Sequence, residues 1–378
     1  RYRRKFFVVR SVDDRMMRRF LRFTVAVMLV GALALPVGAA ELPRVSLGYI
    51  FTTHQQPIMV AMAKGEAFEP LGVFLKPVVE KERYDLIADG APVARLTIVV
   101  TKSGSEMATL FAQNHLNIGL GSLPAMMSSI DGGTPIKVLC PVHTEGMGFV
   151  VASDSPVKDW DSLLATIRGG SKPYRIGYHS PTSAPKIVLE GALLEAGLKL
   201  THDGADLSAN VLLVDLKSTG NLAPALTSGQ VDAWVGPDPF PAVAEVRKTG
   251  RVVFDLRELP PAGRWSSFPC CVAAARKDFL ADHPEVARAV VKLLTAASEW
   301  SNANRQEAGV IGAQWIGIPE EATEHATIIY GTNPNDSWLK GAGVYLDVLN
   351  GMNSFKGSLK GKTLEEAVPM IFDFSFNK

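Results

Sequence analysis

Hydroxyl, amide and imidazole side chains follow the ends of the apolar strands that the sequence predicts. In an open α/β sheet, ligands bind beyond the carboxyl ends of the strands. The predicted strands end near Tyr49, Leu120, Tyr178 and Val235. The residues expected to contact a ligand are therefore Thr52, Thr53, His54, Gln55, Gly121, Ser122, His179, Ser180, Thr182, Ser183, Asp238 and Phe240.

The chemistry of this set favours an anion. Several of the loops enter helices, where exposed backbone N–H groups and Ser or Thr hydroxyls suit an oxyanion such as a sulfonate, carboxylate or nitrate. For any single hydroxyl the alternative role is the capping of its helix. Taken as a set, the residues favour a binding cleft.

A second group of polar residues, Thr144 and Glu145, follows His143 at a point where the chain changes from one α/β unit to the next. Glu145 could contact a cationic part of a solute, because a carboxylate inside a cleft needs a partner. Alternatively, it could be solvated at this crossover. Trp265 and Phe268 could pack on the apolar body of a ligand or in the core.

Metal and catalytic chemistry are less favoured. A metal site is the least favoured role for His54, because the histidines at 54, 115, 143, 179 and 202 lack ligand spacings such as His-x-x-x-His. Beyond residue 40 there is no Gly-x-Ser-x-Gly, phosphate-loop or dinucleotide fingerprint. We therefore predict no catalytic residue, no metal and no cofactor.

The cysteines are Cys140, Cys270 and Cys271. One pair could bridge in an oxidising compartment. A bridge between the adjacent Cys270 and Cys271 is disfavoured by its strained geometry. Pairing of Cys140 with either of the others remains open at this point.

The charge balance limits the classes of partner. The chain has 39 Lys and Arg against 38 Asp and Glu, a net charge of +1. This near balance gives no reason to expect nucleic acid or a membrane surface as partner.

Short apolar strands alternate with helical patterns along the chain, which is typical of an α/β fold. We expect Glu80–Ala94 to be a charged, irregular excursion, and the chain to be mainly helical from His283 onward. The predicted strands are Val45–Tyr49, Val73–Val79, Leu96–Val100, Leu116–Leu120, Ile136–Leu139, Phe149–Ala152, Arg175–Tyr178, Val211–Asp215, one that Gly229–Val235 leads into, Val252–Leu256 and Val272–Ala275.

An export signal is predicted before Glu41. Arg18, Arg19 and Arg22 precede an apolar run over residues 24–37, and small residues follow at 38–40. This order is typical of a secretory signal, with cleavage expected after Ala39 or Ala40. Translation is expected to start at Met16 or Met17, so we exclude residues 1–15 from the fold. The remainder is expected to work in the periplasm.

Several segments, in this order, resemble the substrate-binding proteins of nitrate, sulfonate and taurine ABC transporters, a broad family that includes thiamine-pyrimidine binding proteins. Glu80–Ala94 and Phe51–His54 depart from the family's pattern. The segments that carry the resemblance are Val45-Ser-Leu-Gly-Tyr49, Gln55-Gln-Pro57, Ala61-Met-Ala-Lys-Gly65, Phe68-Glu-Pro-Leu-Gly-Val73, Leu116-Asn-Ile-Gly-Leu120, Gly133-Thr-Pro-Ile-Lys-Val138, Ser228-Gly-Gln-Val-Asp-Ala233, Pro237-Asp-Pro-Phe240 and Arg276-Lys-Asp-Phe-Leu-Ala-Asp-His-Pro-Glu285.

The resemblance implies a two-lobed periplasmic-binding-protein type II fold with two crossovers between the lobes. Residues 42–141 and 241–378 would form lobe one, and residues 142–240 lobe two. Such a protein is a monomeric carrier rather than an enzyme. It closes around a small anionic or zwitterionic solute and delivers it to a membrane ABC permease with its ATPase.

Two alternatives accompany this interpretation. Fungal thiamine-pyrimidine synthases resemble the same binding proteins and carry a cysteine-rich iron motif, of which Pro269-Cys-Cys-Val272 is at best a fragment. A sensory protein that reports its solute to a receptor would have the same sequence features.

Overall fold

The computed structural model describes residues 5, 41–324 and 326–377, and the chain divides into two units between Leu42 and Pro43. The fold described below is that of Pro43–Lys378. The export signal predicted within residues 16–40 lies outside the described residues.

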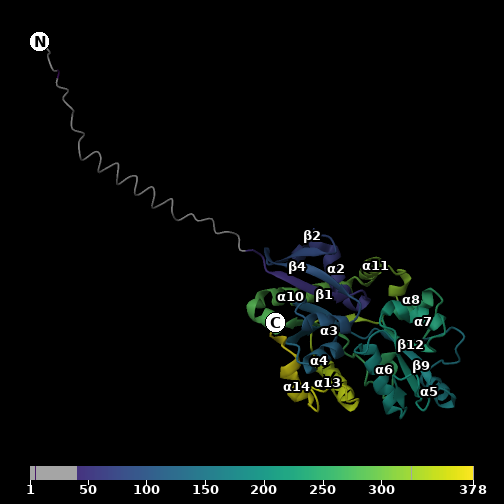
Figure 1. Cartoon of the computed structure of the whole chain (residues 1–378). Coiled ribbons are helices and arrows are strands. Elements are labelled where there is room, and N and C mark those ends of the chain that lie inside the picture. The colour runs from purple at the N-terminus through teal and green to yellow at the C-terminus, as the bar shows by residue number, and fades with distance from the viewer. Residues whose placement is uncertain (1–4, 6–40, 325, 378) are drawn as a thin grey trace. The chain divides into compact units, whose positions relative to one another are not determined.

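Two mixed sheets organise this unit, and they occupy separate regions of the ribbon in Figure 1. The first sheet has seven strands, and its strands in spatial order are β2 (Val73–Val79), β3 (Arg83–Ala88), β4 (Ala91–Thr101), β1 (Arg44–Ile50), β5 (Ile118–Ser122), β14 (Cys271–Arg276) and β6 (Ile136–Pro141). The second has six, which are β10 (Leu200–Thr201), β11 (Val211–Asp215), β9 (Tyr174–Tyr178), β12 (Ala233–Pro237), β8 (Met147–Val151) and β13 (Arg251–Asp255).

In each sheet, a strand next to the crossovers runs antiparallel to both of its neighbours. In the first sheet β14 is antiparallel to both β5 and β6, whereas β1 is parallel to β4 and β5. In the second sheet β8 is antiparallel to β12 and β13, whereas β9 is parallel to β11 and β12. The chain thus leaves the first sheet after β6 and returns to it at β14, which confirms the predicted two-lobed α/β fold with two crossovers.

Helices connect the strands, as expected for parallel pairs. Those that follow strands of the first sheet are α2 (Gln56–Lys64), α3 (Gly104–Ala112) and α4 (Leu123–Asp131). Those that follow strands of the second are α5 (Trp160–Gly169), α6 (Ala184–Glu195), α7 (Leu222–Thr227) and α8 (Phe240–Val246). The chain after β14 forms α9 (Lys277–Asp282), α10 (Pro284–Ala303), α11 (Arg305–Ile316), α12 (Glu321–Glu324), α13 (Asp336–Gly351) and α14 (Leu364–Ile371).

The local patterns explain these elements. In β1 the side chains of Val45, Leu47 and Tyr49 are buried at alternate positions, as period 2 requires of a strand. In α10 the buried side chains Val286, Val290 and Leu294 recur at helical spacing, and the helix packs on α2 and the first sheet. Among the described residues, no helix is long and apolar enough to cross a membrane.

The predicted irregular excursion at Glu80–Ala94 is wrong. This segment contains β3 and most of the first half of β4, which pair antiparallel. Asp89 and Gly90 have φ values of +51° and +81°, so they form the tight turn that an Asp-Gly pair favours. Tyr84 and Leu86 are buried at alternate positions, and the charged residues before Tyr84, together with Asp85, masked that alternation in the sequence.

The second sheet also extends further along the chain than the expected boundary at Phe240. β13 pairs with β8, and therefore the return crossover begins after Asp255. A third, two-stranded sheet joins β7 (His143–Thr144) to β15 (Ile329–Tyr330). It lies at the first crossover and braces it from the C-terminal part of the chain.

Candidate functional site

A small cavity lies where the loops after β1, β5 and β9 meet the ends of β12 and the start of β14. Its volume is about 30 Å³, which holds a single water molecule or ion. A cavity of this size is too small for an organic solute. The residues that line the cavity are Ile50, Thr52, His54, Gln55, Gly104, Ser122, His179, Ser183, Ala184, Pro185, Pro237, Cys270 and Cys271.

The structure brings many of the predicted ligand residues to this cavity. Those that line it are Thr52, His54, Gln55, Ser122, His179 and Ser183. Thr53 and Gly121 are buried beside it, and Thr144, Glu145 and Asp238 lie at or next to the first crossover. Phe240 lines a different cavity of about 380 Å³ together with Trp234 and Arg247. The structure therefore does not place Phe240 at this site.

Hydrogen bonds between hydroxyl-bearing residues cross the cleft from one lobe to the other. Ser105 Oγ lies 2.9 Å from Ser180 Oγ and 3.2 Å from Thr182 Oγ1. Ser122 Oγ donates to the Thr182 carbonyl oxygen at 2.9 Å. Ser105 and Ser122 belong to the first lobe, and Ser180 and Thr182 to the second. We call these four residues the cleft bridge.

Two helices begin at the cavity without a side-chain cap. Ser122 and Ser183 are the N-cap residues of α4 and α6, but neither hydroxyl accepts a bond from its own helix. Ser183 Oγ instead donates to the Ser180 carbonyl oxygen at 2.9 Å. Ser103, by contrast, caps α3 by accepting from Glu106 N at 3.2 Å. The capping role that was open for these hydroxyls thus does not apply to Ser122 or Ser183.

The two crossovers run side by side and are hydrogen-bonded to each other. Cys270 N donates to the His143 carbonyl oxygen at 3.4 Å, and Glu145 N donates to the Phe268 carbonyl oxygen at 3.3 Å. Glu145 Oε1 accepts from Ser267 N, while Oε2 is buried without a partner. Burial raises the pKa of the Glu145 carboxyl. Glu145 therefore fastens one crossover to the other.

Asp238 follows β12 and also contacts the first crossover. Its backbone N donates to the Gly146 carbonyl oxygen at 2.9 Å, and its carboxylate accepts from Thr327 N at 3.3 Å. Burial, together with the nearby Asp255 carboxylate, raises the pKa of Asp238 to about 7. Small changes near neutral pH therefore alter the charge at this crossover.

Four buried side chains from different parts of the chain converge beside the cavity: His54, Cys270 and Cys271, which line it, and His143, which does not. One ligand atom from each lies within 4.8 Å of all the others. His54 Nδ1 lies 3.3 Å from Cys270 Sγ and 3.8 Å from Cys271 Sγ. The His54 and His143 rings have centroids 4.2 Å apart. We call this group the His–Cys cluster.

The environment of the His–Cys cluster keeps its imidazoles neutral. Burial lowers the pKa of His143 to about 3, and burial followed by the neighbouring His143 lowers that of His54. Burial raises the pKa of Cys270. Burial also acts to raise the pKa of Cys271, but hydrogen bonds with Cys270, His54 and Gln55 outweigh it and lower that pKa to about 6.

All three cysteines are free and buried, so the pairing of Cys140 with Cys270 or Cys271 is not formed. Sequence spacing did not indicate the His–Cys cluster, because its members belong to distant segments: His54 and Cys270 are 216 positions apart. The adjacent cysteines were the one local signal for it. The prediction that His54 is no metal ligand rested on spacing alone, and this juxtaposition removes that reason.

Trp265 and Phe268 lie in the core. Both are almost fully buried, and Phe268 packs edge-on against Trp265 and Tyr345. Trp265 Nε1 donates to the Pro260 carbonyl oxygen at 3.2 Å. Of the two roles considered from the sequence, both residues therefore have the core-packing role, and they lie on the second crossover.

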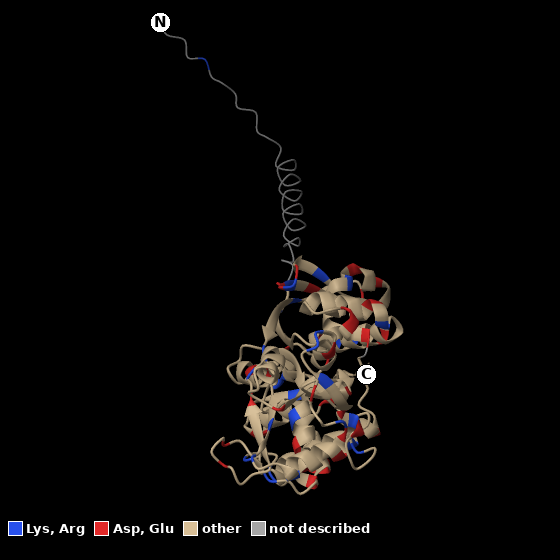
Figure 2. Cartoon of the chain, turned by 90° about the vertical axis from the view of Figure 1, so that its right-hand side faces the viewer, with Lys and Arg blue, Asp and Glu red and all other residues tan. Residues whose placement is uncertain are grey.

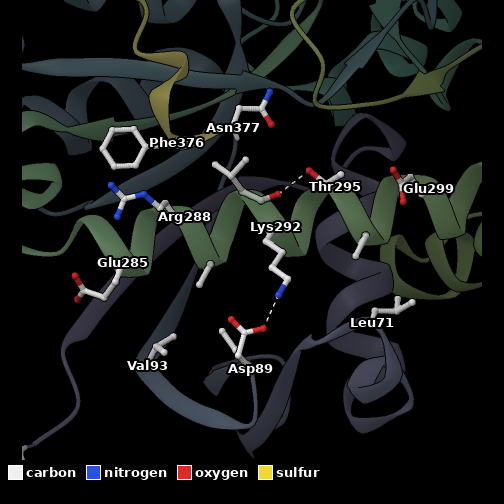
Figure 3. A pocket seen from close by; sticks show the side chains of 14 residues that line it. Leu71, Asp89, Val93, Glu285, Arg288, Lys292, Thr295, Glu299, Phe376 and Asn377 are labelled. Carbon is white, nitrogen blue, oxygen red and sulfur yellow. Dashed lines mark hydrogen bonds and ion pairs between the residues drawn. The ribbon is translucent and has the colours of Figure 1, made fainter.

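A larger groove, of about 640 Å³, runs along α10 on the first lobe (Figure 3). Its polar side chains bind one another, as in the 2.7 Å ion pair of Lys292 with Asp89. Thr295 Oγ1 donates within α10 to the Val291 carbonyl oxygen at 3.0 Å. These groups do not converge on a common point, and therefore the interlobe cavity is the better candidate site.

Comparison with known proteins gives a consistent result. The sequence profile of the NMT1-like family matches residues 38–317. A ligand-binding component of an ABC-type import system from Staphylococcus aureus, solved with zinc bound, superposes with a TM-score of 0.67 at 16% identity, over 88% of this chain and 97% of that one.

Two further solved structures share the fold. The alkanesulfonate-binding protein SsuA from Xanthomonas axonopodis pv. citri, bound to MOPS, has a TM-score of 0.63 at 16% identity. The match covers 88% of this chain and 99% of the SsuA chain. The periplasmic nitrate-binding protein NrtA from Synechocystis PCC 6803 has a TM-score of 0.57 at 15% identity. That match covers 75% of this chain and 69% of the NrtA chain. At these identities the likeness establishes the periplasmic-binding-protein fold.

Proposed function

Because the chain belongs to the NMT1-like family, among the nitrate, sulfonate and taurine substrate-binding proteins, we propose that it is the solute-binding component of an ABC importer. It takes up a small anionic or zwitterionic solute between its lobes and delivers the solute to a membrane permease with its ATPase. It acts in the periplasm as a monomer, and it performs no catalysis.

The observation that carries this proposal is the pair of uncapped helix starts at one cavity. The N-termini of α4 and α6 face it from opposite lobes, and neither helix has a side-chain cap. Leu123 N already donates to the Cys270 carbonyl oxygen, and Pro124 and Pro185 have no N–H. The first-turn N–H groups without a side-chain acceptor are therefore those of Ala125 on α4 and of Ala184 and Lys186 on α6. Such N–H groups and the positive ends of the helix dipoles favour an anion. A sulfonate or nitrate group bound there would contact both lobes at once.

The surface charge fits a small solute better than a polyanion. Figure 2 shows Lys and Arg interspersed with Asp and Glu over the described part of the chain. Selectivity for an anion must therefore come from the cavity itself. Oriented backbone donors provide it without a net charge on the protein.

Thermal-shift measurements with the purified protein test the proposal. The panel comprises short alkanesulfonates, taurine, nitrate and carboxylates, with neutral sulfones of the same alkyl length as matched controls. A ligand at 100 times its Kd stabilises the folded state by about 2.7 kcal/mol, which raises the Tm by several degrees. We expect at least one anion to do so while its neutral analogue does not. Equal shifts with the neutral analogues, or none with any anion, would contradict the proposal.

A further inference from the structure

The His–Cys cluster has the composition and convergence of a metal centre, which no part of the proposed transport function requires. Its side chains are buried, with 1–4% of their surface exposed. A tetrahedral Zn²⁺ with bonds of roughly 2.0–2.3 Å separates its ligand atoms by about 3.3–3.8 Å. The two N···S distances from His54 Nδ1, 3.3 Å to Cys270 Sγ and 3.8 Å to Cys271 Sγ, already fall in this range. The widest pair, within 4.8 Å, needs to contract by only about 1 Å.

Both imidazoles present an unprotonated nitrogen to the cluster. His54 Nε2 lies 2.7 Å from the Gly146 carbonyl oxygen, which can only accept, so Nε2 carries the proton and Nδ1 faces the thiols. His143 Nδ1 lies 3.3 Å from the Thr144 carbonyl oxygen and donates to it in the same way. A metal-binding histidine is typically oriented by such a bond from its other ring nitrogen.

His143 supplies the second, independent observation. Its Nε2 is buried and has no hydrogen-bond partner. A buried polar atom without a partner carries a desolvation cost of about 1–3 kcal/mol unless something binds it. Because Nδ1 holds the proton, Nε2 offers a lone pair, which is the requirement for a metal ligand.

The backbone fixes the two thiols in place. Cys270 precedes β14 and lies outside its regular alternation, so its Sγ and that of Cys271 reach the same cluster although the residues are adjacent. The Cys270 and Cys271 carbonyl oxygens accept from Leu123 N at 2.8 Å and Val142 N at 2.9 Å. Gln55 Nε2 donates to Cys271 Sγ at 3.1 Å, as outer partners of metal thiolates do.

We propose that His54 Nδ1, His143 Nε2, Cys270 Sγ and Cys271 Sγ bind one Zn²⁺ ion in a four-coordinate site. Two thiolates and two neutral imidazoles balance the ion's charge, which makes its burial favourable, and the two thiol protons leave on binding. Four protein ligands leave no open position for a solute. The ion would fasten the first crossover, through His143, to the first lobe, through His54 and the cysteines.

Metal binding to the purified, reduced and chelator-treated protein tests this proposal. We expect one Zn²⁺ per chain by elemental analysis after gel filtration. Co²⁺, used as a spectroscopic probe, should give the thiolate charge-transfer and tetrahedral ligand-field bands of an S₂N₂ site. This spectrum is recorded on the unaltered protein and does not depend on the folding of any variant. Protein without bound metal, or a Co²⁺ spectrum of an octahedral, oxygen-bound ion, would overturn the proposal.

Variants assign the ligands. Cys270→Ser and Cys271→Ser should each weaken Zn²⁺ binding by more than about 100-fold, beyond the effect usual for an outer partner, and His143→Gln should do the same. Cys140→Ser is the matched control, because Cys140 is also free and buried but lies outside the His–Cys cluster. Equal loss in the Cys140 variant, or undiminished binding in both Cys270 and Cys271 variants, would refute the assignment. Retained anion binding in the metal-free protein would separate this site from the proposed transport function.

Discussion

His54 and Gly146 are joined by a 2.7 Å hydrogen bond from the imidazole Nε2 to the carbonyl oxygen. The bond links the loop after β1 to the first crossover and fixes which ring nitrogen of His54 faces the cysteines. Gly146 has a φ of +77°, and an added Cβ would overlap Ile328 Cγ1 and come within 3.1 Å of His54 Nε2. The crossover can therefore approach His54 this closely only with glycine at position 146.

Gly146→Ala should destabilise the protein more than the same change at Gly197, which has the same φ of +77° but nothing within 4 Å of the added Cβ. The left-handed backbone alone costs about 1–2 kcal/mol in each variant. Crowding at position 146 should add roughly 1–3 kcal/mol. Urea unfolding measures both variants, and equal losses would show that Ile328 and His54 do not constrain this position.

Asp238→Asn should change how stability depends on pH. The folded-state pKa of about 7 lies above the ordinary value of 3.8, so between these two pH values only the unfolded chain has lost the proton. The raised pKa therefore contributes to the free energy of unfolding in full below pH 3.8. This contribution is lost as pH rises to about 7, and its size is about 1.4 kcal/mol for each unit by which the folded-state and unfolded-state pKa values differ. We expect the variant to gain stability over the original protein as pH rises across this window. A difference between their unfolding free energies that is constant with pH would contradict this.

His179→Gln should act in the opposite direction. Burial lowers the pKa of His179 from 6.5 to about 4, with the Asp215 carboxylate opposing the shift. The unfolded chain therefore binds a proton first as pH falls, so this histidine contributes to the loss of stability from about pH 6.5 to 4. The variant should flatten that part of the stability curve. Replacement of the exposed His115 by Gln is the control, and an equal flattening there would rule out the assignment.

Removing a hydroxyl from the cleft bridge should favour the open form. Ser105→Ala deletes the contacts to Ser180 and Thr182, and a hydrogen bond contributes about 0.5–1.5 kcal/mol, or roughly a 2- to 12-fold change in the balance of open and closed forms. Small-angle scattering should show a larger radius of gyration. Thr109→Ala is the control, because its hydroxyl bonds only within α3. An unchanged radius in Ser105→Ala would argue against a bridge that holds the lobes together.

The sequence predicts most of the strands and the residues at the strand ends that line the cavity. It does not predict the β3–β4 hairpin or the His–Cys cluster. Alternation identified β1, and the strand-end rule found Ser122 and Ser183, because these signals are local. The hairpin at Asp89 and Gly90 was missed because charged residues obscure the buried positions of β3.

The His–Cys cluster could not be found in this way. Its members come together only when the two crossovers run side by side, as the bond from Cys270 N to the His143 carbonyl oxygen shows. That pairing depends on where β14 enters the first sheet, which no local pattern specifies. The hydroxyls of Ser122 and Ser183 were ambiguous for a related reason, since capping and bridging use the same residue type.

Isothermal titration with the anion that gives the largest thermal shift tests the central claim most directly, comparing the protein with Ser183→Asp. Aspartate is a strong N-cap, so its carboxylate should fill the start of α6, preserve the fold and exclude an anion. Thr363→Asp at the capped start of α14 is the control. We predict one anion per chain for the original protein and the control, with binding at least about 10-fold weaker in Ser183→Asp. Equal affinity in all three proteins would contradict an anion site between the lobes.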